Sequence, residues 1–184
     1  QLAMMEDAEQ TGIFVEKMAD FFRYNVKKGQ EDATLGEELE AVDNYIYILN
    51  VRFAGDIHSS KDVHESLENV RVPSMILQPV VENAVNHGIR DIEWEGKIHL
   101  TVTGDADYIR ISVKDNGKGM TPEQIEGVLT GNKKYKKEEG DSTGIGMNNV
   151  ISRLELYYEE TGLVEINSEG EGKGTEVVIY IPVN

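Results

Sequence analysis

The chain has 184 residues, of which 39% are hydrophobic, so it is long enough for one large domain with a core or for a domain with an extension. It has no cysteine, which excludes a disulfide framework and a thiolate site. Its formal net charge of −16 argues against a nucleic-acid ligand, because like charges repel phosphate, and no apolar run is long enough to span a membrane.

Two helices are predicted at the start of the chain. Residues 1 to about 28 form the first, with Phe14 and Met18 on one apolar face, and a capping box of Thr34 and Glu37 begins the second. Along the second helix, apolar residues recur at alternating spacings of four and three, as in a heptad seam: Leu35, Leu39, Val42, Ile46, Leu49 and Phe53. This seam favours packing against partner helices in a bundle or a dimer. The alternative, that both helices pack on their own globular domain, stays open.

The pattern then changes to mixed strands and helices. Residues 55–62 are predicted to be a turn, and a strand at 63–72 is followed by a helix from Pro73 to about His87. The remaining predicted elements are strands at 97–103 and 108–114, a capped helix start at 121–124, a polar loop at 130–143, a helix from 145 to 160, and strands at 163–168 and 175–182. We therefore expect the α+β class: a helical hairpin followed by an α/β sandwich with helices on one face of a mostly antiparallel sheet.

Four segments of the second part carry the polar and glycine residues of a candidate site. They are "QPVVENAVNHG" (78–88), "DNGKGM" (115–120), "STGIGMNNV" (142–150) and "GKGTEVVIYIP" (172–182). Asn83 and His87 share one helix face, and a glycine pair at the start of a helix leaves free N–H groups that favour an anion. Each segment alone is a weak signal, because Gly-x-Gly is usually a turn, and neither the dinucleotide fingerprint nor a Walker A sequence is present. All four in this order are a much more specific signal.

The four segments resemble the N, G1, G2 and G3 boxes of the Bergerat-fold (GHKL) ATPases, the superfamily of histidine kinases, gyrase B, the heat-shock chaperone and MutL. More narrowly, "LQPVVENAVNHG" and "GIGMNNVISRL" are similar to the LytS/YesM-type bacterial sensor histidine kinases, and "EELEAVDNYIYILNVRF" is similar to the second helix of their dimerisation region. The resemblance implies dimerisation and histidine-phosphotransfer helices at residues 1–57 and an ATP-binding catalytic domain at residues 58–184. It also implies ATP and Mg²⁺ as ligands.

Carried over to this sequence, the resemblance implies a role for each box. Asp115 would accept a hydrogen bond from the adenine amino group, and Gly117 and Gly119 would leave room for the base. Asn83 would bind Mg²⁺ through its amide oxygen, because hard cations prefer oxygen. The residues implied to bind ATP are Asn83, Asn86, His87, Gly88, Asp115, Gly117, Gly119, Met120, Lys133, Lys134, Gly144, Ile145, Gly146, Met147 and Thr175.

The loop at 130–143 would be the ATP lid, and its lysines either reach phosphate or form a solvated charge run. Two positions depart from the pattern of the superfamily. Asn86 stands where many members have a lysine, and Pro79 stands where gyrase has the acidic residue that activates water. Glu82, next to Asn83, is given the catalytic role of polarising the reacting group or the water shell of the metal.

The family's phosphoacceptor histidine lies in a Pro-His-Phe setting, which none of the four histidines here has: His58, His64, His87 and His99. We therefore expect the acceptor upstream of Gln1, on a helix that this sequence lacks, and a membrane anchor of the parent protein would also lie there. The resemblance implies a homodimer in the full-length protein, on the cytoplasmic side of the membrane, with a response regulator as partner and no nucleic acid. The alternatives are an ATP-hydrolysing module and a nucleotide-binding adaptor.

Overall fold

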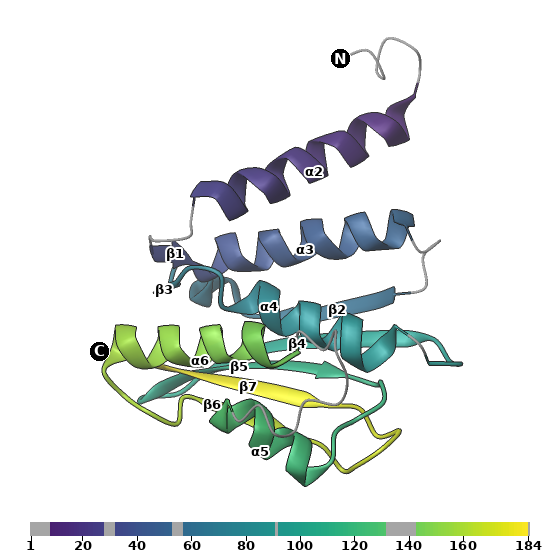
Figure 1. The fold of residues 1–184 in the computed structure, drawn as a ribbon. Coiled ribbons are helices and arrows are strands. Elements are labelled where there is room, and N and C mark those ends of the chain that lie inside the picture. Colours follow the sequence, from purple (N-terminus) through teal and green to yellow (C-terminus); the bar gives the residue numbers. More distant parts are fainter. Residues whose placement is uncertain (1–7, 28–31, 53–56, 91, 132–142, 184) are drawn as a thin grey trace.

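The computed structural model describes residues 8–27, 32–52, 57–90, 92–131 and 143–183. Two helices, α2 (Glu9–Lys27) and α3 (Leu35–Arg52), lie against each other on one side of an α/β layer structure (Figure 1). The predicted capping box is confirmed: the Thr34 N–H donates to Glu37 Oε2 at 2.9 Å, and the Glu37 N–H donates to Thr34 Oγ1 at 3.2 Å. The described part of the predicted hairpin is therefore helical as expected.

The five-stranded sheet has the order β2-β4-β5-β7-β6. Its strands are β2 (Ile57–Val63), β4 (Gly96–Gly104), β5 (Tyr108–Asp115), β7 (Glu176–Pro182) and β6 (Val164–Asn167). Among these pairs β2–β4 is parallel, and the other three are antiparallel, as a mostly antiparallel sheet requires. Buried and exposed residues alternate along β4, so one face of the sheet is turned to the core.

The predictions for residues 55–73 are wrong. The predicted turn at 55–62 contains the strand β2, which has a single buried residue, Ile57, and therefore lacks the apolar alternation of a strand. The predicted strand at 63–72 is instead a short 3₁₀-helix, η1 (Glu65–Leu67), followed by β3 (Arg71–Pro73), which pairs with β1 (Asp32–Thr34). Pairing with distant strands, rather than local pattern, produces β2 and β3.

The helix predicted to begin at Pro73 begins instead at Leu77. It comprises α4 (Leu77–Asn83) and continues as a π-helix, η2 (Ala84–Ile89). The other two helices are α5 (Pro122–Thr130), which begins with the predicted capping box, and α6 (Thr143–Tyr158). Helices α4 and α6 pack against each other over one face of the sheet (Figure 1), and α5 packs against α6. This arrangement confirms the predicted α+β class.

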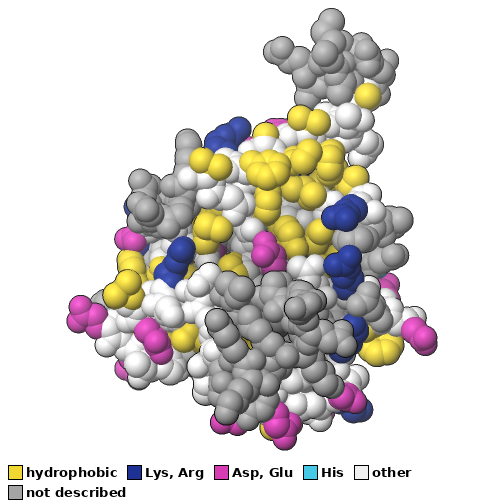
Figure 2. All heavy atoms as spheres, viewed as in Figure 1, with side chains coloured by type: hydrophobic (Ala, Val, Ile, Leu, Met, Phe, Trp, Pro, Cys, Tyr) yellow, Lys and Arg dark blue, Asp and Glu magenta, His cyan; other side chains and the backbone are white. Residues whose placement is uncertain are grey.

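The apolar seam of α3 packs on this domain. Leu35, Leu39, Val42 and Ile46 are at most 5% exposed and belong to the same core cluster as Leu77 of α4. The preference for bundle or dimer packing of this seam is therefore wrong, because the spacing defines an apolar face but not the element that covers it. Four large apolar side chains of the hairpin remain exposed: Val15, Phe22, Val26 and Val51. Figure 2 shows hydrophobic side chains gathered over this part of the molecule.

We predict that Leu39→Ala lowers the free energy of unfolding of the whole domain by about 2–5 kcal/mol, the scale of a buried leucine replaced by alanine. Chemical denaturation followed by the fluorescence of Trp94, the single tryptophan, measures this in the loop before β4 rather than at α3. The control is Leu156→Ala, at a position that is 83% exposed, where a change within about 0.5 kcal/mol is expected. A Trp94 transition at the wild-type midpoint in Leu39→Ala would mean that α3 is not part of the core.

Candidate nucleotide-binding site

The side chain of Asp115 lies at the end of β5, where it is 5% exposed. Its Oδ1 accepts two backbone hydrogen bonds, from the N–H of Gly117 at 2.8 Å and from the N–H of Thr175 at 3.3 Å. Burial raises the pKa of the carboxyl above its ordinary value, and the two hydrogen bonds lower it in part. Both bonds go to the same oxygen, so Oδ2 is the oxygen that can accept a hydrogen bond from a ligand.

The backbone of the N box meets the G1 box at glycines. A Cβ added to Gly88 would lie 2.8 Å from Asp115 Oδ1, and one added to Gly117 would lie 2.2 Å from the carbonyl oxygen of Gly88. Both distances are too short for a side chain, so these positions require glycine. The N–H of Lys118 also donates to the carbonyl of Gly88 at 2.9 Å. The end of the π-helix is therefore fixed to the G1 segment.

The G3 segment joins the same place. The N–H of Asp115 donates to the carbonyl of Thr175 at 2.9 Å, and the N–H of Gly174 donates to the carbonyl of Gly117 at 3.1 Å. A Cβ on Gly174 would lie 2.1 Å from the Asp115 carbonyl oxygen, and Gly119, with φ +70°, packs as closely on the turn at Gly170. Three of the four boxes thus converge on one buried carboxylate.

The N box also provides an orphan acceptor. Asn83 Oδ1 is buried and has no hydrogen-bond partner in the described part of the chain, and leaving a buried polar atom unpaired is costly. An amide oxygen of this kind fits Mg²⁺, which prefers oxygen ligands and usually keeps several waters and phosphate oxygens as well. The described residues contain no group of three or more His, Cys, Asp or Glu that could hold a metal ion.

Glu82 and Asn86 lie on the side of the N-box helix that faces α3. Glu82 Oε1 accepts a hydrogen bond from Gln78 Nε2 at 2.8 Å. Burial and the charge of Glu82 raise the pKa of Tyr45, on α3, to about 12, and a hydrogen bond from Asn86 lowers it in part. The structure therefore places these two predicted residues beside Tyr45.

Helix α6 begins at Thr143, two residues before the predicted start, so its first turn carries the glycines of the G2 box. A Cβ on Gly146 would have ordinary contact, 3.8 Å, with the side chain of Pro79 on α4, so this end of α6 lies beside the N-box helix. Met147, which was predicted to bind ATP, is fully buried in the core. Lys133, Lys134 and most of the predicted lid lie outside the described residues.

His87, also in the N box, is half-buried, and Met120 packs partly against the core. Sequence reasoning did not find Ser168, whose hydroxyl accepts the Met120 N–H at 3.0 Å and donates to the Gly174 carbonyl at 2.7 Å. It also missed Asn116, whose side chain accepts the Lys97 N–H at 2.7 Å. Gly-Lys-Gly-Thr was a signal for Gly174, and Asn116 lies within "DNGKGM" although no role was assigned to it, but no sequence pattern marked Ser168.

The layered fold and the convergence of these boxes define an ATP-binding domain of the Bergerat type. The chain belongs to the family of histidine kinase-, DNA gyrase B- and HSP90-like ATPases, whose family model matches residues 71–184. A second family model, described as histidine kinase, matches residues 1–57. The sequence-based assignment to the Bergerat-fold superfamily is confirmed.

The relatives of this chain are sensor kinases. It is 34% identical over 166 residues to the sensor histidine kinase YpdA of Escherichia coli (strain K12), over 90% of this chain and 27% of the relative. It is 28% identical over 178 residues to the sensor protein LytS of Bacillus subtilis (strain 168), over 96% of this chain and 29% of the relative. The resemblance to the LytS type is thereby confirmed. The chain spans less than a third of the length of these relatives.

Solved structures share the fold. The catalytic domain of histidine kinase ThkA superposes with a TM-score of 0.58 at 21% identity, over 83% of this chain and 94% of that chain. The mycobacterial sensor histidine kinase MprB superposes with a TM-score of 0.60 at 17% identity, over 83% of this chain and 96% of that chain. Among the described helices, none combines the length and the apolar character needed to cross a membrane.

We predict that Asp115→Asn makes the ligand-free protein more stable at neutral pH. The folded-state pKa of Asp115 is raised above its unfolded value of about 3.9, so between the two values the native state binds more protons than the unfolded state. The stability that the protonated Asp115 carboxyl contributes is present below the unfolded pKa and is lost as the pH rises through the folded pKa. Asparagine keeps an acceptor for both N–H groups and has no charge to bury.

Urea denaturation of both proteins at several pH values from 3 to 8, a range chosen to bracket that window, measures the difference in unfolding free energy. We expect the difference to grow in favour of Asp115→Asn as the pH rises through the window. The matched control is Asp107→Asn, which makes the same substitution in the exposed turn before β5. A difference that is independent of pH would contradict the assignment of a raised pKa to Asp115.

Proposed function

We propose that the chain is the ATP-binding catalytic part of a two-component sensor histidine kinase, and that it donates the γ-phosphate of ATP to a histidine on an upstream helix. The phosphohistidine would then supply a response regulator. The observation that carries this proposal is the buried Asp115 carboxylate, enclosed by glycines of the N, G1 and G3 boxes. A buried carboxylate with an oxygen left for a ligand suits an amino group such as that of adenine.

The described residues suggest how each part of the nucleotide would be held. Asp115 Oδ2 would accept the adenine amino hydrogen, while its Oδ1 is fixed by Gly117 and Thr175. Asn83 Oδ1, which has no hydrogen-bond partner among the described residues, would bind Mg²⁺, and this ion would neutralise charge on the phosphates during transfer. Backbone N–H groups at the start of α6, where Gly146 lies, would bind phosphate oxygens.

Positioning and charge neutralisation would supply most of the catalysis, because phosphoryl transfer has little covalent chemistry for the protein to perform. Glu82 is proposed to polarise the reacting group or the metal's water shell, acting from beside Gln78. Asn86 would contact phosphate in place of the lysine of other family members. Lys133 and Lys134 of the proposed lid would add positive charge, which offsets the acidic net charge locally.

For the parent protein, we propose a homodimer on the cytoplasmic side of the membrane, with residues 1–57 as part of the dimerisation region and residues 58–184 as the catalytic domain. The match of a histidine kinase family model to residues 1–57 supports this division. The exposed apolar side chains of α2, such as Phe22 and Val26, support a helix that packs against further helices.

We predict that the chain binds Mg-ATP and that Asp115→Asn weakens the binding by about 1–3 kcal/mol, the scale for loss of a charged hydrogen-bond partner. Asparagine would use its oxygen for the two backbone N–H groups and turn a donor toward the adenine amino group. Isothermal calorimetry measures the affinity, and Asp107→Asn is again the matched control. Equal affinity in Asp115→Asn and the wild type would remove adenine recognition from this residue.

We also predict that none of the four histidines of this chain becomes phosphorylated. His58 pairs with Glu95 at 2.9 Å, His99 Nδ1 lies 2.8 Å from Ser60 Oγ, and His64 accepts the Ser66 N–H. These three lie on or beside the edge strand β2 and its neighbour β4 rather than at the glycine boxes, although His58 was expected in a turn. The fourth, His87, lies in the N box itself.

Incubation with γ-labelled ATP, followed by acid and base treatment, tests this, because phosphohistidine is acid-labile and base-stable. We expect no such label on the chain alone and weak label on an added peptide that carries a Pro-His-Phe helix. Stoichiometric acid-labile label on the chain alone would contradict the proposal that the acceptor lies elsewhere. Steady hydrolysis of ATP without label would favour the ATP-hydrolysing alternative.

A further inference from the structure

A buried carboxylate on α3 meets the start of the N-box helix. Glu38 is 1% exposed, and its oxygens accept hydrogen bonds from three successive backbone N–H groups at the N-terminus of α4. The distances are 2.5 Å to the N of Met75, 2.9 Å to the N of Ile76 and 2.8 Å to the N of Leu77. The first N–H groups of a helix have no partner within it, and Ile76, the N-cap residue, makes no side-chain cap bond. The cap of α4 therefore comes from α3.

The turn that Glu38 holds is conformationally unusual. Met75 has φ 60°, in the left-handed region that residues with a side chain seldom adopt, and such a conformation persists only where the surroundings impose it. One imposing contact is the Met75 N–H bond to Glu38, and a second comes from α6, where Arg153 Nη1 donates to the carbonyl of Ser74. The position of the turn thus depends on two other helices.

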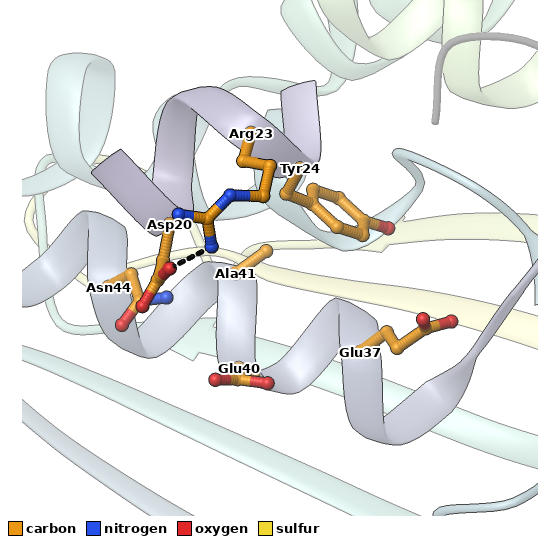
Figure 3. A pocket seen from close by; sticks show the side chains of 7 residues that line it. All are labelled: Asp20, Arg23, Tyr24, Glu37, Glu40, Ala41 and Asn44. Atoms are coloured by element: carbon orange, nitrogen blue, oxygen red, sulfur yellow. Dashed lines mark hydrogen bonds and ion pairs between the residues drawn. The ribbon is translucent and has the colours of Figure 1, made fainter. Parts of the chain in front are cut away.

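Helix α2 reaches the same carboxylate through Tyr24, whose hydroxyl donates to Glu38 Oε1. Burial and the charge of Glu38 raise the pKa of Tyr24 well above its ordinary value, so the hydroxyl stays protonated as a donor. Tyr24 on α2 and Glu40 on the facing helix α3 line a hollow of about 300 Å³. Figure 3 shows both side chains. Glu38 and Glu40 are on the same helix, but Glu40 is exposed.

We propose that Glu38 is a positioning residue for the Mg²⁺ end of the nucleotide site, and that Tyr24 links this position to α2. The inference rests on the proposed function, because it takes Asn83 as the residue that binds Mg²⁺. Asn83 lies six residues after Leu77, about 9 Å along a helix. The other end of the segment is fixed independently, because the Gly88 carbonyl accepts the Lys118 N–H at 2.9 Å.

Loss of the Glu38 contacts would therefore weaken binding at the Mg²⁺ end of the site more than at the adenine end. Asp115 is held by Gly117 and Thr175, which both lie outside the N-box helix. Asn83 lies between the two fixed points of the N-box helix, and it loses one of them when the cap is removed. Mg²⁺-dependent affinity should fall, whereas recognition of the adenine end should remain.

The test is calorimetric titration with Mg-ADP and with metal-free ADP in EDTA, from which the ratio of the two affinities is taken. We expect Glu38→Gln to reduce this ratio by about fivefold or more, the lower end of typical coupling between sites. A variant that only populates more unfolded protein loses both affinities by the same factor, so its ratio stays constant. Glu40→Gln makes the same charge change on the same helix at an exposed position, and should keep the wild-type ratio.

A folded Glu38→Gln with the wild-type ratio would overturn the inference. If circular dichroism shows that Glu38→Gln is unfolded, Tyr24→Phe decides, because it removes one hydrogen bond to Glu38 and keeps the ring. We expect it to lower the ratio in the same direction by about twofold, and an unchanged ratio would overturn the link. Failure of the wild type to bind ADP at all would instead overturn the proposed function.

Discussion

The hydrogen bonds to one oxygen, Asp115 Oδ1, set the geometry on which the site depends. To bring the N–H groups of Gly117 and Thr175 to the same acceptor, the ends of β5 and β7 must meet the G1 turn at a single point. The carboxylate is buried there, and burial disfavours its charged form and so raises its pKa. A fold that keeps a charge at a position where it is costly usually does so for a ligand, and the second oxygen of the carboxylate is the atom that would meet it.

This constraint explains the glycines before any ligand is considered. The π-helix passes so close to Asp115 that a Cβ at Gly88 would lie 2.8 Å from Oδ1. The G1 turn passes closer still to Gly88, because a Cβ at Gly117 would lie 2.2 Å from its carbonyl oxygen. The first atoms that a side chain at Gly117 would strike are thus protein atoms, not a base. π-Helical segments occur frequently at functional sites, and here the segment brings the backbone of the N box against the carboxylate.

The same constraint explains what the sequence could predict. Few residue types can occupy positions of close backbone approach or left-handed turns. The boxes at Gly88, Asp115 and Gly174 could therefore be recognised in the sequence, and they predicted the class of fold. Strand β2 was not visible, because it is polar and is stabilised by pairing with β4, some forty residues later. Glu38 was hidden for a related reason: in sequence it is one of several acidic residues on a helix, and its buried hydrogen bonds exist only in the tertiary structure.

The apolar seam of α3 shows why the packing of the hairpin could not be predicted from its spacing. A face with spacings of four and three satisfies a coiled-coil partner and a globular core equally well, so the pattern alone could not choose between them. In the structure, the seam of α3 packs in the domain core and its Glu38 carboxylate accepts hydrogen bonds from the start of the N-box helix, while α2 retains exposed apolar side chains. Helix α3 is therefore structurally part of the ATP-binding body, although a histidine kinase family model covers it as well. A displacement of α2 would reach α4 first through Tyr24 and Glu38, because these side chains join the two helices directly.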